Sequence, residues 1–355
     1  LHGRAAEEAR ASDAVTAYDG LLQDPPYPKL DLLDPDTNTI ASASRLEMFA
    51  RTPYLYFVTY VLEAEPLDEP ALDDEDWLDP LTRGTILHRT YELFLGGSRE
   101  LDIKELGRMP TLEDEDALMD AFEIAFEEAT QQRGTPPNEQ VKTAAREGLI
   151  TDVRAFLHAD AARTTDQPDL TPERFEWSFG NRPRDEHPEV ELATERGTLR
   201  LRGAVDRIDH LNGDALIWDY KTGGMRDYDP LDGLRNKRWS LQWMLYARAV
   251  EEALGLSVAR SGYYFATARQ MGRTVAYPPD GTGDSHPDTY REDLVRILNT
   301  LSEMARHGVF VPSGDSLKQS DWRYNYTPLV YDRRNRREQI RAKDWPDDLP
   351  HLHHD

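Results

Sequence analysis

The order of apolar and polar positions along the chain predicts a mixed α/β structure. Apolar residues recur at three- and four-residue spacing in several long stretches, which is typical of helices that bury one face. The predicted helices are Ser42–Leu62, Asp79–Leu95, Leu112–Ala129, Asn138–His158, Trp239–Leu254 and Asp288–His307. Shorter runs of β-branched and aromatic residues predict strands. Outside the central hairpin these are Thr171–Phe179, Ser261–Thr267 and Arg273–Tyr277, with the last two paired.

Two of the predicted helices begin with recognisable capping residues. Ser44 and Glu47 fit a capping box at the start of the first helix, which Pro53 should bend or interrupt. Asp79 can cap the second helix, with Pro80 at its first position.

The central stretch, Leu199–Gly224, predicts a β-hairpin. Its Asn-Gly dipeptide at positions 212 and 213 suits a type I′ turn, in which both central residues need positive φ. A two-residue turn fixes the register if the strands contain no bulge. Asp206 and Asp219 then face each other, and Lys221 points to the same side opposite the small Ala204.

Two carboxylates that face each other across a strand pair repel, so the pair needs a positive partner. A divalent metal with oxygen ligands satisfies this need, and Mg²⁺ commonly takes one or two carboxylates. A lysine beside such an ion can orient a water or offset charge that develops on a phosphate. The alternative is a solvated hairpin face on which Lys221 pairs with one aspartate.

Composition excludes several kinds of protein. The 355 residues contain no cysteine, so the chain has no disulfide, no thiolate zinc site and no cysteine-bound iron–sulfur cluster. No apolar run is long enough to span a membrane, no signal-peptide pattern opens the chain, and no phosphate-binding P-loop motif occurs. We therefore expect a cytoplasmic protein. Because Leu1 is not methionine, the chain is consistent with a fragment of a longer protein.

The formal net charge of −24 argues at first sight against a nucleic-acid partner. Only seven of the 42 basic residues are lysines, and excess acid with few lysines suggests adaptation to a high-salt cytoplasm. Basic residues are nevertheless locally enriched around the hairpin. The candidates for contacting phosphates are Arg202, Arg207, Arg226, Arg235, Lys237 and Arg238.

Four further side chains are candidate site residues, although each of them, taken alone, is better explained by a structural role. His88 follows Gly84 by one helical turn, but a lone helical histidine is usually not a metal ligand. Glu176 could add a carboxylate near Asp206, although an exposed strand glutamate is the preferred interpretation. Gln242 and Tyr246 share one helix face and, taken alone, mark the border of that face.

The chain divides into three parts by composition. Residues 1–40 are polar and proline-rich and predict a short helix followed by a linker. Residues 41–330 form the main domain, with a helical insertion at about residues 110–160, and residues 331–355 form a tail.

Taken in order, four motifs and the opening helix resemble the PD-(D/E)XK nuclease superfamily, in its RecB-like branch. The motifs are GTILH with His88, GAVDRID with Asp206, DYK with Asp219 and Lys221, and Q-x-x-x-Y with Gln242 and Tyr246. The opening stretch from Ser42 is similar to the start of the C-terminal nuclease domain of AddB-type helicase–nuclease subunits, and the resemblance extends to about Tyr326.

The resemblance implies a three-layer, restriction-endonuclease-like α/β fold around a mixed sheet. It implies that His88, Asp206, Asp219 and the backbone carbonyl of Tyr220 bind Mg²⁺ or Mn²⁺. It assigns Lys221 to the attacking water and the scissile phosphate, and Gln242 and Tyr246 to organising DNA and the catalytic groups.

The sequence departs from the family at the four cysteines that hold an iron–sulfur cluster in many AddB-type members. The matching positions are Thr52, Leu317, Ser320 and Tyr326, none of which can ligate iron. We therefore expect no cluster, with aromatic packing of Trp322, Tyr324 and Tyr326 on Phe49 and Tyr56 in its place.

The sequence thus predicts a metal-dependent deoxyribonuclease, an exonuclease rather than an endonuclease. By analogy it acts on single-stranded DNA ends within a helicase–nuclease of double-strand break repair and recombination, with a helicase partner or a preceding helicase region. The alternatives are a catalytically silent DNA-binding or scaffolding module of such a complex, and a structural metal-binding hairpin.

Overall fold

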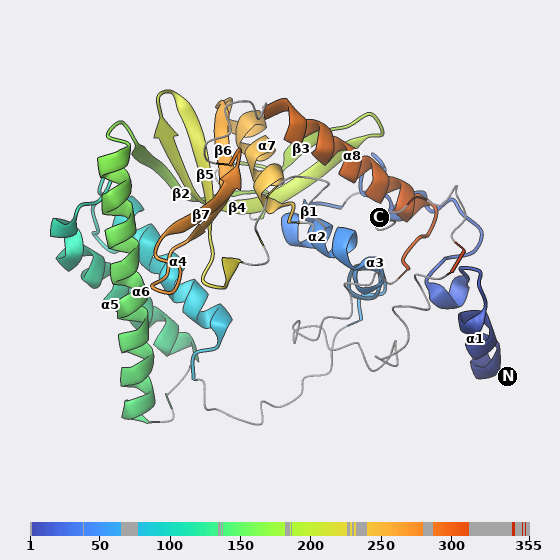
Figure 1. Ribbon diagram of the computed structural model, residues 1–355, viewed down its shortest axis with the longest axis horizontal. Coiled ribbons are helices and arrows are strands. Elements are labelled where there is room, and N and C mark those ends of the chain that lie inside the picture. The colour runs from blue at the N-terminus through green and yellow to red at the C-terminus, as the bar shows by residue number, and fades with distance from the viewer. Residues whose placement is uncertain are drawn as a thin grey trace.

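The computed structural model describes residues 2–37, 39–64, 77–133, 136, 138–181, 185, 187–225, 228, 231, 240–279, 287–311, 343–344, 350 and 352. Figure 1 shows the arrangement of its elements. The α-helices are α1 (His2–Ala11), α2 (Ala43–Arg51), α3 (Pro53–Tyr56), α4 (Pro80–Gly96), α5 (Glu115–Arg133), α6 (Glu139–Asp166), α7 (Gln242–Leu254) and α8 (Pro287–Arg306). The strands are β1 (Ala41–Ser42), β2 (Thr171–Phe179), β3 (Val190–Ala193), β4 (Thr198–Leu211), β5 (Asp214–Tyr220), β6 (Val258–Phe265) and β7 (Arg273–Tyr277).

The strands form one mixed sheet, as predicted. Its main path runs β1-β4-β5-β6-β7, and β2 and β3 also pair with the long strand β4. The β1–β4 and β5–β6 pairs are parallel, and the other pairs are antiparallel. The predicted pairing of the last two strands, β6 and β7, is confirmed.

Helices cover both faces of this sheet, which gives the three predicted layers (Figure 1). The core on one face contains residues of α2, α7 and α8, and the core on the other face contains residues of α4, α5 and α6. Strand β5 serves both cores, with Ala215 and Ile217 on the first side and Leu216, Trp218 and Tyr220 on the second. None of the described helices is long and apolar enough to cross a membrane.

Regular strand pairing is interrupted at Glu176 and Asp206. Strand β2 pairs with β4 through Phe175 and Trp177, but the pairing skips Glu176 between them. Residues two apart share a face in a regular strand, yet Trp177 packs in the α2–α7–α8 core and Phe175 packs against the α4–α6 core. Glu176 has a φ of 47°, a left-handed value that residues other than glycine rarely adopt. The strands therefore change face at this point.

The predicted hairpin is confirmed in its turn and in most of its register. Residues 212 and 213 have φ values of 55° and 94°, as a type I′ turn requires. Pairs follow the predicted register from the turn to Arg207 and Trp218. Among the described residues this ladder stops there, so Asp206 does not pair with Asp219 as predicted. Instead the Asp206 carboxylate accepts a hydrogen bond from the Tyr220 N–H at 2.6 Å.

The first predicted helix differs from its predicted form at its start. The hydroxyl of Ser42 caps α2 by accepting a hydrogen bond from Arg45 N–H at 3.2 Å, so the predicted capping box of Ser44 and Glu47 is wrong. The helix is interrupted at Pro53, as predicted, and continues as α3 and a π-helical turn, Phe57–Val61. The Glu47 side chain reaches α7 instead.

Both ends of the chain contribute to the packed structure. Residues before Ala41 were predicted to form a linker, but Leu33 is buried in the core and the Leu22 N–H donates to the Gly308 carbonyl at 2.9 Å. Lys343, within the predicted tail, is also buried, and its Nζ donates to the carbonyl oxygens of residues 9, 12 and 14.

Aromatic side chains pack around Thr52, the first of the positions that the resemblance aligns with cluster cysteines. Phe49 stacks on Tyr56 at a centroid distance of 4.2 Å, and Phe310 stacks on both at 5.6 and 6.3 Å. The positions predicted to pack here or aligned with cluster cysteines, Leu317, Ser320, Trp322, Tyr324 and Tyr326, lie outside the described residues.

Arg207 is a structural residue, and its prediction as a phosphate contact is wrong. It is fully buried, and its guanidinium pairs with Asp160 of α6 and with Asp209, each at 2.5 Å. Asp209 also accepts hydrogen bonds from Arg163 at 2.9 Å and from the Trp218 indole at 3.0 Å. The change of face at Asp206 directs Arg207 toward the helical insertion, where this buried ion cluster joins α6 to the sheet.

We expect Arg207→Ala to lower the free energy of unfolding by about 3–5 kcal/mol, because it leaves two buried carboxylates without their main partner. The exposed Arg202 of the same strand provides the control, and Arg202→Ala should change stability by less than about 0.5 kcal/mol. Urea unfolding measures both. Equal unfolding midpoints for the two variants would contradict the structural role of Arg207.

Candidate active site

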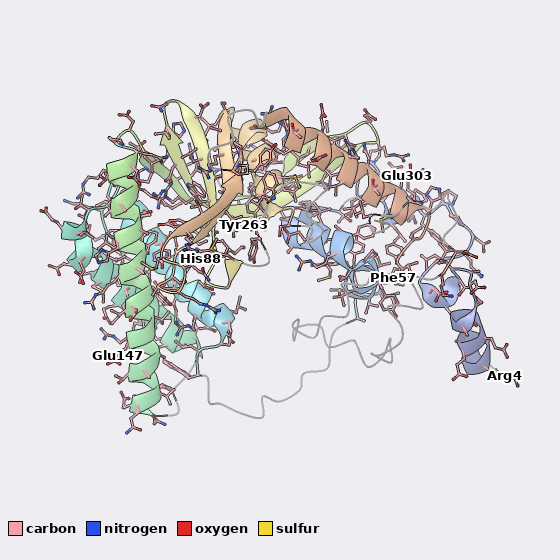
Figure 2. All side chains as sticks on the ribbon, viewed as in Figure 1. Arg4, Phe57, His88, Glu147, Tyr263 and Glu303 are labelled. Carbon is pink, nitrogen blue, oxygen red and sulfur yellow. The ribbon has the colours of Figure 1, made fainter. Side chains whose placement is uncertain are left out.

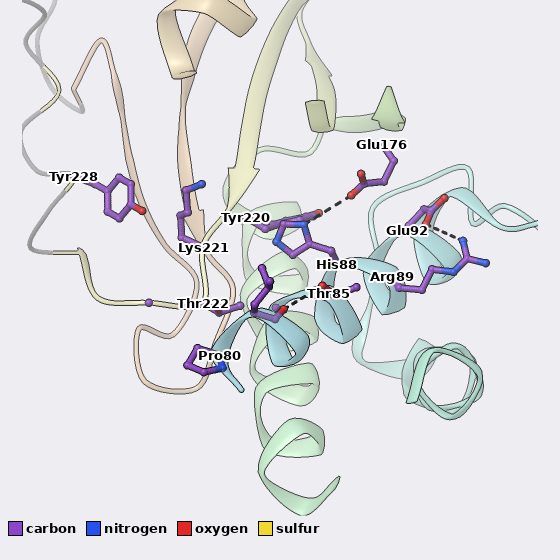
Figure 3. Close-up of a pocket in the computed structure, with 13 residues that line it drawn as sticks. Pro80, Thr85, His88, Arg89, Glu92, Glu176, Tyr220, Lys221, Thr222 and Tyr228 are labelled. Carbon is purple, nitrogen blue, oxygen red and sulfur yellow. Dashed lines mark hydrogen bonds and ion pairs between the residues drawn. The ribbon is translucent and has the colours of Figure 1, made fainter. Parts of the chain in front are cut away.

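The predicted site residues gather near the middle of β4 and the end of β5, between α4 and α7. Figure 2 shows His88 and Tyr263 near the middle of the molecule, where the two helical layers meet the sheet. A cavity of about 650 Å³ opens here, and His88, Glu176 and Lys221 line it (Figure 3). His88 comes from α4 and Asp206 from β4. Asp219 and Tyr220 end β5, and Lys221 follows directly. Gln242 and Tyr246 come from α7.

Helix α4 holds His88 at the cavity wall. Asp79 caps this helix as predicted, accepting a hydrogen bond from Thr82 N–H at 2.7 Å. The His88 Nδ1 atom lies 3.5 Å from Asp206 Oδ2 and 3.8 Å from Glu176 Oε1. The imidazole packs edge-on against Tyr220 at 5.6 Å, so a buried aromatic ring fixes its orientation.

Glu176 belongs to this group, contrary to the preferred interpretation of an exposed strand residue. Its side chain is half-buried and points toward His88 (Figure 3). Removal from water raises the pKa of its carboxyl, and the charges of Asp206 and Glu92 raise it further. The residue pattern of β2 does not predict the left-handed backbone at Glu176. The presence of a carboxylate on a strand expected near Asp206 was the one signal that pointed to this residue.

Asp206 and Asp219 are both buried. Burial raises the pKa of the Asp206 carboxyl, and the Asp219 charge raises it further, while His88 and Lys221 act in the opposite direction. The site therefore concentrates negative charge in a place with little water, which favours binding of a cation.

Lys221 and Gln242 contact Asp219 from the α7 side. The Lys221 ammonium pairs with Asp219 Oδ2, and the Gln242 amide donates to Asp219 Oδ1. Lys221 Nζ also donates to Gln242 Oε1 at 3.2 Å and lies 5.2 Å from the Tyr263 ring centroid. Removal from water lowers the pKa of Lys221, but the charge and hydrogen bond of Asp219, with Tyr228 and Asp206, together outweigh this effect. The pKa is therefore raised, which favours a charged ammonium.

Tyr246 lies one turn after Gln242 but packs between α7 and the sheet. A Cβ atom on Gly203 would lie 2.7 Å from the Tyr246 ring, so the absence of a side chain there makes room for the tyrosine. The ring meets Phe179 edge-on at 6.2 Å. Burial raises the pKa of the Tyr246 hydroxyl above its usual value, so the hydroxyl keeps its proton near neutrality.

The predicted phosphate contacts fall into three groups. Arg202 is exposed on β4, and Arg207 is buried in the ion cluster described above. The remaining four, Arg226, Arg235, Lys237 and Arg238, lie outside the described residues.

The chemistry of the clustered side chains fits a divalent metal. His88, Glu176 and Asp206 each offer one ligand atom, and the three atoms lie within 4.8 Å of one another. Carboxylate oxygens suit Mg²⁺ and Mn²⁺, and imidazole is also a ligand for first-row metals. Asp219 adjoins this group, with its carboxylate in contact with Lys221 and Gln242.

Comparison with known proteins finds relatives that are each named as a subunit of an ATP-dependent helicase/deoxyribonuclease. The chain is 26% identical over 235 residues to that of Limosilactobacillus fermentum, covering 60% of this chain and 18% of the relative. It is 26% identical over 234 residues to that of Leuconostoc citreum, covering 63% and 18%, and 24% identical over 189 residues to that of Clostridium tetani, covering 51% and 15%. The chain spans less than a fifth of the length of these relatives.

A comparison with models of protein families matches most of the chain to one family. Residues 40–316 match the model of the PD-(D/E)XK nuclease superfamily, and this range contains the strands, the helical insertion and every predicted site residue. The fold, with its mixed sheet between two helical layers, is consistent with that match. The chain therefore belongs to the PD-(D/E)XK nuclease superfamily.

Proposed function

We propose that this chain is a metal-dependent DNA nuclease domain that hydrolyses phosphodiester bonds. The observation that carries the proposal is one arrangement at the cavity wall. The His88–Glu176–Asp206 group lies beside Asp219, which Lys221 and Gln242 contact. A silent module would have no need to gather like charges in a site that raises their pKa values.

His88, Glu176 and Asp206 are the residues that would hold the ion, with Asp219 and the Tyr220 carbonyl as additional ligands. The ion is Mg²⁺ or Mn²⁺, and no iron–sulfur cluster takes part because the chain has no cysteine. A bound divalent cation supplies Lewis-acid activation of a phosphoryl group and lowers the pKa of a bound water.

The chain's own residues would position the reacting groups. The charged Lys221 ammonium borders the cavity, where it can orient a water and offset negative charge that develops on a phosphate. Gln242 fixes Lys221 and Asp219 relative to each other through its amide. Tyr246 supports the first turns of α7 against the sheet.

Phosphates approaching this cavity would require cations from other parts of the chain. Among the described lining residues the basic ones are Lys221 and Arg89, and Arg89 is paired with Glu92 at 2.8 Å and Glu128 at 3.0 Å. We assign this role to Arg202 and to the basic segment containing Arg226, Arg235, Lys237 and Arg238.

The names of the relatives support a place beside a helicase. The substrate we propose is a single-stranded DNA end delivered by a helicase partner or a preceding helicase region during double-strand break repair or recombination. Digestion from an end makes the domain an exonuclease, acting in the cytoplasm.

Lys221→Ala and Asp219→Ala should each lower DNA cleavage by at least about 10²-fold, because they remove a transition-state charge partner or its anchor. The assay compares end-labelled linear and covalently closed circular single-stranded DNA, with Mg²⁺, Mn²⁺ or EDTA. Lys104→Ala, on the exposed surface, is the control and should cut normally.

An exonuclease cuts the linear DNA and leaves the circle intact. If the folded wild type binds DNA but cuts neither substrate with either metal, the silent DNA-binding module becomes the better account.

Metal binding can be tested without cleavage. Titration of Mn²⁺, followed by the electron paramagnetic resonance signal of the free ion, should show one or more sites whose affinity falls at least about 10-fold in Glu176→Gln and Asp206→Asn. Glu173→Gln changes another β2 carboxylate, which pairs with His210, and serves as the control. Equal Mn²⁺ affinities for Glu176→Gln and Glu173→Gln would remove Glu176 from the proposed ligand set.

We also propose that the net charge of −24 adapts the fold to a high-salt cytoplasm. Molar KCl shortens the Debye length from about 10 Å at 0.1 M to about 3 Å, which screens repulsion between surface carboxylates. The urea midpoint should therefore rise between 0.1 and 1 M KCl, as measured by circular dichroism. A midpoint that does not change with salt would contradict this adaptation.

A further inference from the structure

The start of α7 is capped by a side chain from a distant helix. The N–H groups of Leu241 and Gln242 both donate to Glu47 Oε1 of α2, at 2.7 and 2.9 Å. The first N–H groups of a helix have no partner within the helix, and Leu241, at the N-cap position, makes no side-chain cap of its own. One carboxylate oxygen therefore satisfies two donors at the positive end of α7.

Helix α2 gives Glu47 a rigid base. The neighbouring residues Leu46, Phe49 and Ala50 are buried in the core, and Phe49 stacks on Tyr56. A carboxylate held on a well-packed helix offers one geometry to its donors, unlike a side chain on an exposed loop. The position of α2 therefore determines where α7 begins.

Gln242, at the start of α7, carries the side-chain amide that contacts both Lys221 and Asp219. Gln242 is the first residue of α7, and its side chain donates to Asp219 and accepts from Lys221 at 3.2 Å. A side-chain amide makes both contacts at once only in one orientation. Fixing the Gln242 backbone therefore fixes the pair that borders the cavity.

The charge environment of Glu47 is consistent with this contact. Removal from water raises the pKa of its carboxyl, while the N–H donors and the positive charges of Arg51 and Lys221 act in the opposite direction. Lys221 thus lies near enough to influence Glu47 electrostatically, which places the carboxylate behind the site.

We propose that Glu47 is a positioning residue for phosphodiester hydrolysis: it fixes the first turn of α7 and thereby holds the Gln242 amide between Asp219 and Lys221. The inference rests on the nuclease function proposed above. Within the part of the chain that the structure describes, the hydrogen bonds of Glu47 go to Leu241 and Gln242 and not to the proposed metal ligands or Lys221, so it acts through Gln242.

The test measures kcat and KM of DNA cleavage for variants that separate the hydrogen bonds from the charge. Glu47→Ala removes both bonds, Glu47→Gln keeps an amide oxygen that can accept both, and Glu47→Asp keeps the charge on a side chain one methylene too short. Gln242→Ala and the double variant with Glu47→Ala complete a thermodynamic cycle. All rates are measured well below each variant's melting temperature.

A destabilising change at the other end of α7 provides the control. Glu251 accepts a hydrogen bond from the Tyr290 hydroxyl of α8 at 3.0 Å, far along the helix from Gln242. Glu251→Ala should lower the melting temperature while leaving kcat unchanged, which shows what loosening of α7 alone does.

We expect Glu47→Ala to lower kcat on the order of 10- to 100-fold with little change in KM, as for loss of a group that supports catalytic ligands. Glu47→Asp should lose most of the same activity, and Glu47→Gln should retain it. The double variant should be no slower than Gln242→Ala. Mn²⁺ affinity should stay at the wild-type value in Glu47→Ala, because the proposed metal ligands are untouched.

The inference alone would be overturned by wild-type kcat in Glu47→Ala, by a loss that adds to that of Gln242→Ala, or by an equal loss in Glu251→Ala. Full activity of Glu47→Asp with loss in Glu47→Gln would also overturn it, because the charge would then matter and the paired hydrogen bonds would not. If the wild type cuts no DNA with either metal, the proposed function is wrong, and the inference, which rests on it, is wrong as well.

Discussion

Mutual repulsion of three carboxylates is the constraint around which the site is organised. Glu176, Asp206 and Asp219 converge where the sheet pairing is interrupted, and burial together with neighbouring charge raises the pKa of the first two. Such a cluster survives only if the surrounding fold imposes it. Here the left-handed backbone at Glu176, the Tyr220 N–H bonded to Asp206, and the Lys221 ammonium beside Asp219 do so.

The interruption of the strands also divides the site between the two helical layers. His88, Glu176 and Asp206 meet on the α4 side, where the ligand atoms for a metal are close together. Lys221 and Gln242 contact Asp219 on the α7 side. Because β5 is buried on both faces, neither layer can shift without disturbing the strand that carries Asp219. The fold therefore couples the metal-binding side of the site to the side that carries the lysine.

The residue pattern of the central hairpin made most of the site's arrangement predictable. The Asn-Gly turn fixes a register as far as Arg207 and Trp218, and Asp206 and Asp219 follow directly after this last regular pair. The prediction failed where the strand stopped being regular. Arg207 was named as a phosphate contact because it lies in a locally basic stretch near the hairpin, and nothing in the residue pattern indicated the left-handed Glu176. A third failure concerns a contact between residues far apart in the sequence. Glu47 fits a local capping motif, but its side chain caps a helix that begins 195 residues later.

Arg207 and Glu47 show how an acidic chain uses charge removed from water to join separate elements of the fold. Asp160 of the insertion meets Arg207 of the sheet, and Glu47 of α2 meets the N–H groups of α7. A carboxylate removed from water is stable only where its partners supply donors in the right positions, so each contact favours one arrangement of the two elements it joins. Hydrophobic packing tolerates small slips that these contacts do not. The Arg207 contact therefore limits how far α6 can move relative to the strand that carries Asp206, and the Glu47 contact limits how far the first turn of α7, which carries Gln242, can move relative to α2.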